Sequence, residues 1–290
     1  MLKQRILTAA LALPAFLAFL IYAPNWILIP FFMVLVAISS YEMAAMLAPK
    51  LEEKFSPQDA PETEKRAPTW LIPLAVGLSC LIFLGSSVYS PTGGKGLVFL
   101  GLLGGILVGA FAAPDNDRAF GRIVGLLVSV VYGAFPWIST WGLYSLGVAM
   151  FNDGARMVIF LCAIVWAGDT GAYFAGKRFG TKKLAPRMSP KKTWEGALAG
   201  LGSSVLGAVV CNLVYGLSLG SWTVIISAGL LGGAFGQMGD LVESVFKRFA
   251  GVKDSGRLFP GHGGFLDRVD GLMFAAPIVW FVLYTFQSGS

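Results

Sequence analysis

Charged residues are scarce in this sequence. Only 13% of the 290 residues are Asp, Glu, Lys or Arg, whereas a soluble domain carries about 25%, and 56% are hydrophobic. This shortage excludes a water-soluble enzyme with a single membrane anchor. The sequence also lacks the alternating ten-residue segments of an outer-membrane barrel. Apolar runs of about 20 residues recur instead, which indicates a helical protein that crosses a membrane several times.

Cysteine and histidine are also rare. The three cysteines, Cys80, Cys162 and Cys211, each lie inside an apolar run and lack the spacing of a metal site or a disulfide framework. Packing is therefore their predicted role. The net charge of +6 is better explained by basic cytoplasmic loops or by contact with anionic lipid than by nucleic acid, so no nucleic acid partner is expected.

The apolar runs predict an all-α polytopic fold with about nine transmembrane helices. The first run follows Lys3 and Arg5 as in a signal peptide, but a second run follows almost at once, so both are interpreted as spans. The expected spans are Ile6–Tyr22, Trp26–Leu47, Thr69–Tyr89, Gly96–Ala113, Ile123–Leu146, Met157–Gly176, Gly196–Leu217, Trp222–Phe246 and Phe265–Phe286. Spans one to five form an N-terminal region, residues 1–165, with a polar linker at 49–68. Spans six to nine form a C-terminal catalytic region, residues 166–287.

The basic residues predict the orientation. With nine spans and a cytoplasmic N-terminus, 20 of the 22 Lys and Arg residues fall on the cytoplasmic side, and only Lys95 and Arg156 fall on the other. The two charged loops, after spans six and eight, then share the cytoplasmic face.

Acidic side chains at membrane depth gather late in the chain. Asp169 lies in span six, Asp240 and Glu243 lie near the end of span eight, and Asp267 and Asp270 open span nine. Because a carboxylate in a membrane span is costly, each is a functional candidate.

Helical spacing indicates that three of these carboxylates converge. Asp240, Ser244 and Lys247 share one helix face, and Asp267 and Asp270 share another. The loop between these two helices is short and returns on the same side of the membrane. Oxygen ligands without His or Cys partners suit Mg²⁺, so Asp240, Asp267 and Asp270 are the predicted metal ligands.

Basic residues and glycines beside these carboxylates predict phosphate binding. In the loop after span eight, the candidates are Arg248, Lys253, Gly263 and His262, the last being either a general base or a residue that orients the loop or contacts phosphate.

The loop after span six contributes a second basic cluster. Here Lys191 and Lys192 precede span seven, and Ser189 or Thr193 could cap its helix with N–H groups facing an anion. Acidic residues for a metal beside basic residues for phosphate indicate phosphoryl or nucleotidyl transfer.

Two stretches of the C-terminal half resemble one family. The later one reads Ser244-Val245-Phe246-Lys247-Arg248, then Lys253-Asp254-Ser255-Gly256, then Phe259-Pro260-Gly261-His262-Gly263-Gly264-Phe265-Leu266-Asp267-Arg268-Val269-Asp270. The earlier one comprises Gly168-Asp169-Thr170-Gly171-Ala172-Tyr173 and Ser189-Pro190-Lys191-Lys192-Thr193-Trp194-Glu195-Gly196. Together they resemble the signature of the phosphatidate cytidylyltransferases, also called CDP-diacylglycerol synthases. The first half resembles that family only in hydropathy and places no site residues.

The resemblance implies a reaction in which CTP and phosphatidic acid give CDP-diacylglycerol and pyrophosphate. It implies a homodimer in a bacterial-type inner membrane, with the active site facing the cytoplasm. The metal and catalytic positions it implies are Asp240, Asp267 and Asp270, with Ser244 and Lys247 beside them. Whether a monovalent cation joins the Mg²⁺ is left open. Two alternatives remain, a CTP-dependent lipid kinase and an ion-coupled transporter with Asp169 and Asp240 as ion sites.

Overall fold

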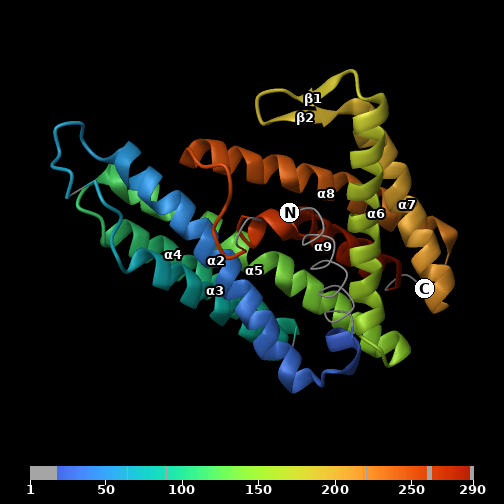
Figure 1. The fold of residues 1–290 in the computed structure, drawn as a ribbon. Helices are drawn as coiled ribbons and strands as arrows, with labels where there is room; N and C mark the ends of the chain where they lie inside the picture. The colour runs from blue at the N-terminus through green and yellow to red at the C-terminus, as the bar shows by residue number, and fades with distance from the viewer. Residues whose placement is uncertain are drawn as a thin grey trace.

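The computed structural model describes residues 18–63, 65–88, 91–217, 219, 221–259 and 263–287, and these are mostly helical. The helices are α2 (Asn25–Phe55), α3 (Leu71–Val88), α4 (Pro91–Phe111), α5 (Asn116–Phe151), α6 (Ala155–Phe179), α7 (Trp194–Tyr215), α8 (Trp222–Ala250) and α9 (Leu266–Gln287). A short hairpin of β1 (Lys183–Ala185) and β2 (Ser189–Thr193) lies between α6 and α7 (Figure 1).

Six of the described helices are long and apolar enough to cross a membrane. They are Trp26–Phe55, Asn116–Phe151, Ala155–Phe179, Trp194–Tyr215, Trp222–Ala250 and Leu266–Phe286. Two further expected spans correspond to α3 and α4, within which Leu71–Ser87 and Val98–Phe111 are shorter apolar helical stretches among the residues whose side chains are described. Most of the first expected span lies outside the described residues. The polytopic fold is confirmed, but the described helices do not reach the expected count of nine.

The hairpin corrects the expectation of an all-α fold. β1 and β2 pair antiparallel, with Lys183 opposite Thr193 and Ala185 opposite Ser189. The segment Ser189–Thr193 contains a proline and two lysines, so it lacks the alternating apolar pattern that predicts a strand. The expected helix cap is confirmed at Thr193, whose side chain accepts a hydrogen bond from the backbone N–H of Gly196 at 3.2 Å.

Two buried clusters join the early and late helices. In one, Trp137 of α5 stacks on Phe265, the residue before α9, with ring centroids 5.9 Å apart. Tyr132 of α5 also meets Phe246 of α8 and Phe274 of α9 edge to face. The start of α9 is therefore packed against α5, which holds the loop after α8 in place.

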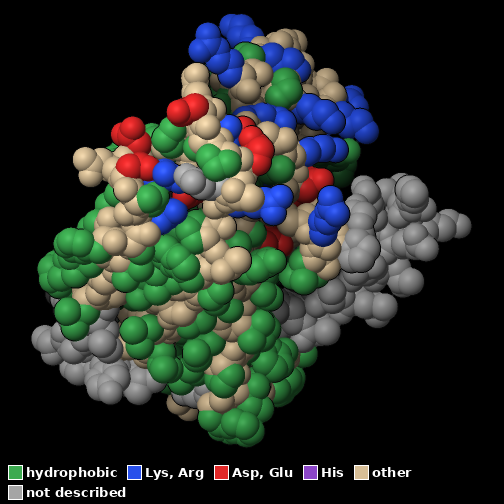
Figure 2. Space-filling view, turned by 90° about the vertical axis from the view of Figure 1, so that its left-hand side faces the viewer, with side chains coloured by type: hydrophobic (Ala, Val, Ile, Leu, Met, Phe, Trp, Pro, Cys, Tyr) green, Lys and Arg blue, Asp and Glu red, His purple; other side chains and the backbone are tan. Residues whose placement is uncertain are grey.

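Charged side chains gather at one end of the molecule. Figure 2 shows Lys, Arg, Asp and Glu side chains together above a body covered by hydrophobic side chains. On the loop before α5, Asp115 caps the helix, and the N–H of Arg118 lowers the pKa of this carboxyl because it stabilises the ionised form. This distribution suits a helix bundle in lipid with one charged end in water.

Candidate active site

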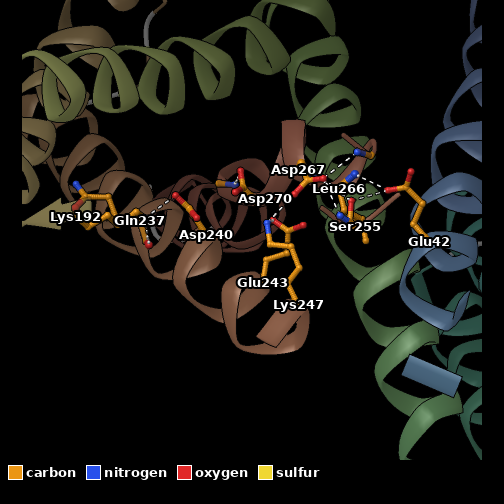
Figure 3. A network of polar contacts seen from close by, with 12 residues as sticks. Glu42, Lys192, Gln237, Asp240, Glu243, Lys247, Ser255, Leu266, Asp267 and Asp270 are labelled. Atoms are coloured by element: carbon orange, nitrogen blue, oxygen red, sulfur yellow. Dashed lines mark hydrogen bonds and ion pairs between the residues drawn. The ribbon is translucent and has the colours of Figure 1, made fainter. Parts of the chain in front are cut away.

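Asp267 lies in the first turn of α9 with both carboxylate oxygens occupied. Its Oδ1 lies 2.7 Å from Nζ of Lys247, from the last turns of α8. Its Oδ2 accepts hydrogen bonds from the backbone N–H groups of Ser255 at 2.8 Å and Gly264 at 2.9 Å, and from Oγ of Ser255 at 3.1 Å (Figure 3). Asp267 therefore fixes three segments to one another: α8, the loop after it and α9.

The backbone at Gly263 accommodates this arrangement. Its φ is +83°, which side-chain-bearing residues rarely adopt, and a Cβ there would lie 2.7 Å from Oδ2 of Asp267. Both the positive φ and the lack of space for a Cβ therefore require glycine at this position. Gly263 therefore leaves the space that the Asp267 carboxylate occupies, and its expected phosphate contact stays a prediction. The neighbouring candidate His262 lies outside the described residues.

Lys247 also contacts Glu243, one turn earlier on α8, with Nζ 3.3 Å from Oε2. The Glu243 side chain is fully buried, and within the described part of the chain neither of its carboxylate oxygens has a hydrogen-bond partner. Lys247 therefore balances two buried carboxylates with one positive charge.

Lys192 and Asp240 connect the hairpin to α8. Nζ of Lys192 lies 2.7 Å from Oδ2 of Asp240 and also donates to the backbone carbonyl of Gln237 at 3.3 Å. The side chain of Gln237 in turn donates to the carbonyl of Ala197 in α7 at 3.1 Å. The structure thus brings together two predicted residues, Lys192 from the loop after span six and Asp240 from span eight.

An open cleft of about 510 Å³ adjoins this pair. Its charged and polar lining comes from α6, the hairpin and α8, and includes Asp169, Lys177, Lys191, Lys192, Gln237 and Asp240. The cleft therefore combines three lysines with two carboxylates.

Lys177 is a cleft residue that was not predicted as a site residue. It lies eight positions after Asp169, with Tyr173 between them, so spacing on one helix face could have identified it.

Asp270 lies between the Asp240 and Asp267 contacts in Figure 3. Here α8 and α9 approach closely, since a Cβ at Gly239 would lie 2.5 Å from the Asp270 carbonyl oxygen. One carboxylate oxygen of Asp270 accepts a hydrogen bond from the N–H of Gly271 at 2.8 Å. Asp240 and Asp270 are thus neighbours on facing helices, while Asp267 is directed to Lys247 and the loop.

The donor chemistry around Asp240 and Asp270 fits Mg²⁺. No three Cys, His, Asp or Glu side chains among the described residues are grouped to hold a metal ion. However, Mg²⁺ commonly takes only one or two carboxylates, together with water and substrate phosphates. The buried Glu243, whose oxygens lack hydrogen-bond partners among the described residues, adds a further carboxyl group on α8. Asp267 can reach a cation only if Lys247 leaves its Oδ1.

The remaining candidates lie around this centre. Ser244 is buried in α8, and Ser189 is half-buried at the start of β2. Arg248 is exposed in the last turn of α8. Lys253 is exposed and lines a separate hollow with Ser255 and other loop residues, so the structure does not bring it into the cleft.

Glu42 of α2 is a contact that the sequence did not predict. Its buried carboxylate accepts hydrogen bonds from Oγ of Ser255 at 2.9 Å and from the backbone N–H groups of Phe265 at 2.9 Å and Leu266 at 3.0 Å (Figure 3). Glu42 was overlooked because the first half of the chain carries no motif. The signal that could have identified it is a carboxylate within an apolar run.

Comparisons with known proteins agree on one family. The cytidylyltransferase family matches residues 3–286. Phosphatidate cytidylyltransferases of Brucella suis and Staphylococcus epidermidis are 51% and 47% identical over 128 residues, which is 44% of this chain and 46% and 49% of those proteins. The matched segment thus spans just under half of each relative. The phosphatidate cytidylyltransferase of Bacillus subtilis is 31% identical over 99% of both chains.

Proposed function

Because this chain belongs to the cytidylyltransferase family, we propose that it transfers the cytidylyl group of CTP to phosphatidic acid, giving CDP-diacylglycerol and pyrophosphate. The observation that carries the proposal is the cleft beside the Lys192–Asp240 pair, at the charged end of an apolar helix bundle. A water-soluble triphosphate and a lipid phosphate can both reach such a position.

CTP binds from the aqueous side of the cleft. Its triphosphate carries several negative charges, and Lys177, Lys191 and Lys192 supply the positive charge to balance them. Arg248 and Ser189 are proposed as further phosphate contacts, as is His262. The acyl chains of phosphatidic acid stay in the bilayer beside the apolar helices.

The reaction needs no strong general base, because the phosphate of phosphatidic acid is already anionic. One of its oxygens attacks the α-phosphorus of CTP, and the new P–O bond forms as the bond from that phosphorus to the β-phosphate oxygen breaks. The electron pair leaves with pyrophosphate, whose added charge Lys192 and Lys247 balance. Ser244 lies one helical turn before Lys247 and is proposed to help orient the reacting phosphate.

We further propose that the activity depends on Mg²⁺. Asp240 and Asp270 would hold it, joined by Asp267 if Lys247 moves to a phosphate, and Asp169 lies across the cleft. When bound, the ion offsets phosphate charge and aligns the two substrates. A second, monovalent cation is an additional proposal.

The setting of the enzyme completes the proposal. The N-terminus and the charged end face the cytoplasm, and the protein lies in the inner membrane of a bacterium, since this orientation places most basic residues inside. A homodimer is proposed from the family resemblance, and chemical cross-linking in native membranes tests it.

Labelled CTP tests the function. In vesicles containing the protein, Mg²⁺ and phosphatidic acid, we expect label from the cytidine to enter lipid. Label that enters lipid only from the γ-phosphate would indicate a lipid kinase, and no label in lipid would favour a carrier. Asp267→Asn should abolish turnover, whereas Asp59→Asn, on an exposed linker, should not. Appreciable turnover by the Asp267 variant would contradict the role given to this carboxylate.

A further inference from the structure

We propose that Glu42 is a positioning residue for cytidylyl transfer: it holds the start of α9 so that Asp267 meets Lys247. Only the predicted effect on kcat rests on the proposed function; the structural role of Glu42 does not. Glu42 lies 225 positions before Asp267 in the chain, on a helix that contributes no residue to the cleft among those described.

Glu42 caps the start of α9 from a different helix. The first N–H groups of a helix have no partner within it, and a carboxylate there also meets the positive end of the helix dipole. Oε1 of Glu42 accepts from the N–H of Phe265, and Oε2 accepts from the N–H of Leu266. The Glu42 side chain is only 4% exposed, so water cannot readily replace these contacts.

Ser255 connects Glu42 to Asp267. Its Oγ lies 2.9 Å from Oε2 of Glu42 and 3.1 Å from Oδ2 of Asp267, and it accepts from the N–H of Asp267 at 3.3 Å. A shift of the Glu42 carboxylate therefore moves the hydroxyl group on which Asp267 rests. Because Oδ1 of the same Asp267 binds Lys247, the shift also alters that ion pair.

Two glycines leave the space that this carboxylate occupies. A Cβ at Gly256 would collide with Oε1 of Glu42, and a Cβ at Gly264 would lie 2.5 Å from its Oε2. The loop backbone at Gly256 therefore lies against Oε1 of Glu42, and the backbone at Gly264 lies against Oε2. Over the described ranges, no Lys or Arg forms an ion pair with Glu42, so hydrogen-bond donors from the loop and α9 stabilise its charge.

Glu52 is a matched control on the same helix. Its side chain is 3% exposed, and it forms an ion pair with Arg122 of α5, with oxygen to nitrogen distances of 2.5 and 3.0 Å. Among the described residues, the Glu52 side chain forms no hydrogen bond or ion pair with the loop after α8, so its variant reports what losing a buried α2 carboxylate does to the fold alone.

The experiment compares Glu42→Gln and Glu52→Gln in the full-length protein. A glutamine oxygen can accept hydrogen bonds, but its NH₂ group cannot accept from Leu266 or Ser255. For Glu42→Gln we expect kcat to fall about tenfold or more with little change in the KM for CTP, because a positioning defect acts on the reacting geometry. Glu52→Gln should lower the melting midpoint and leave kcat unchanged.

A double variant tests the route through Ser255. If Glu42 acts through Ser255, Glu42→Gln combined with Ser255→Ala should lose no more kcat than the worse single variant, within about threefold. Losses that multiply would overturn the route. A kcat loss in Glu52→Gln as large as in Glu42→Gln would overturn the specific role of Glu42.

Hydrogen exchange separates this inference from the proposed function. Deuterium uptake over residues 254–268 should rise in Glu42→Gln and stay at the wild-type level in Glu52→Gln, whether or not the protein turns over CTP. Unchanged uptake in Glu42→Gln would overturn the inference. Absence of cytidine transfer by the wild-type protein would overturn only the proposed function.

Discussion

The ammonium nitrogen of Lys247 lies 2.7 Å from Oδ1 of Asp267, which joins the end of α8 to the first turn of α9. The same nitrogen lies 3.3 Å from the buried Glu243. Lys247 thus contacts two acidic side chains. In the loop between α8 and α9, the backbone N–H groups of Ser255 and Gly264 donate hydrogen bonds to the same Asp267.

Removing this lysine should destabilise the protein. Lys247→Met leaves Glu243 and Asp267 without their cation, and breaking a buried pair from one side typically costs about 3–5 kcal/mol. We expect a large fall in the thermal midpoint in detergent, together with loss of turnover. Arg248→Met removes an exposed charge one position later and should barely move the midpoint. Equal midpoints for the two variants would contradict the buried-pair interpretation.

Lys192→Gln should weaken CTP binding. The variant removes a cleft cation that now pairs with Asp240, and hydrogen bonds to charged groups contribute about 1.5–3 kcal/mol, or roughly 10- to 150-fold in kcat/KM. Initial rates at varied CTP concentration measure this change. Lys183→Gln, at an exposed position in β1 of the same hairpin, is the control and should behave like wild type. If both variants lose the same activity, general hairpin charge and not the cleft position is responsible.

Gly263→Ala and Gly251→Ala form a second matched pair. Both glycines have positive φ, +83° and +71°, so an alanine at either costs about 1 kcal/mol or more in backbone strain. Only at Gly263 would the new Cβ meet Asp267, whereas at Gly251 nothing lies within 4 Å. We therefore expect both variants to lose stability, but only Gly263→Ala to lose turnover by about tenfold or more. Similar turnover in the two variants would show that the Asp267 position tolerates displacement.

Arg122→Met should lower the stability of the protein and leave its turnover unchanged. The side chains of Arg122 and Glu52 are 8% and 3% exposed. The variant leaves the buried Glu52 carboxylate without its cation, which should lower the free energy of unfolding by about 3–5 kcal/mol. Thermal unfolding should report this loss, while the turnover of the remaining folded protein should match wild type. A reduced kcat in properly folded material would place this pair in the functional network.

Hydropathy predicted the long helices that hold the candidate residues. The roles expected from helical spacing for Asp240, Ser244 and Lys247 stay predictions, since Asp240 pairs with Lys192 and Lys247 pairs with Asp267. Thr193 as a helix cap also followed from local chemistry. These features are local, so a single chain contains their evidence.

The parts that were not predicted depend on tertiary contacts. Glu42 meets Leu266 across 224 positions of sequence, and no periodicity connects them. The side-chain partners of Asp267 depend on the path of a loop, which composition does not determine. Pairing between Lys192 and Asp240 likewise required the hairpin, whose strands lack the apolar alternation that marks a strand.

No loop separates the hairpin from α7. β2 ends at Thr193 and α7 begins at the next residue, where Thr193 caps it. Lys191 and Lys192 of β2 therefore share the tilt of α7, which is long and apolar enough to cross a bilayer. Since helices adjust their tilt to the thickness of the surrounding lipid, we expect a thicker or thinner membrane to change the tilt of the hairpin together with that of α7.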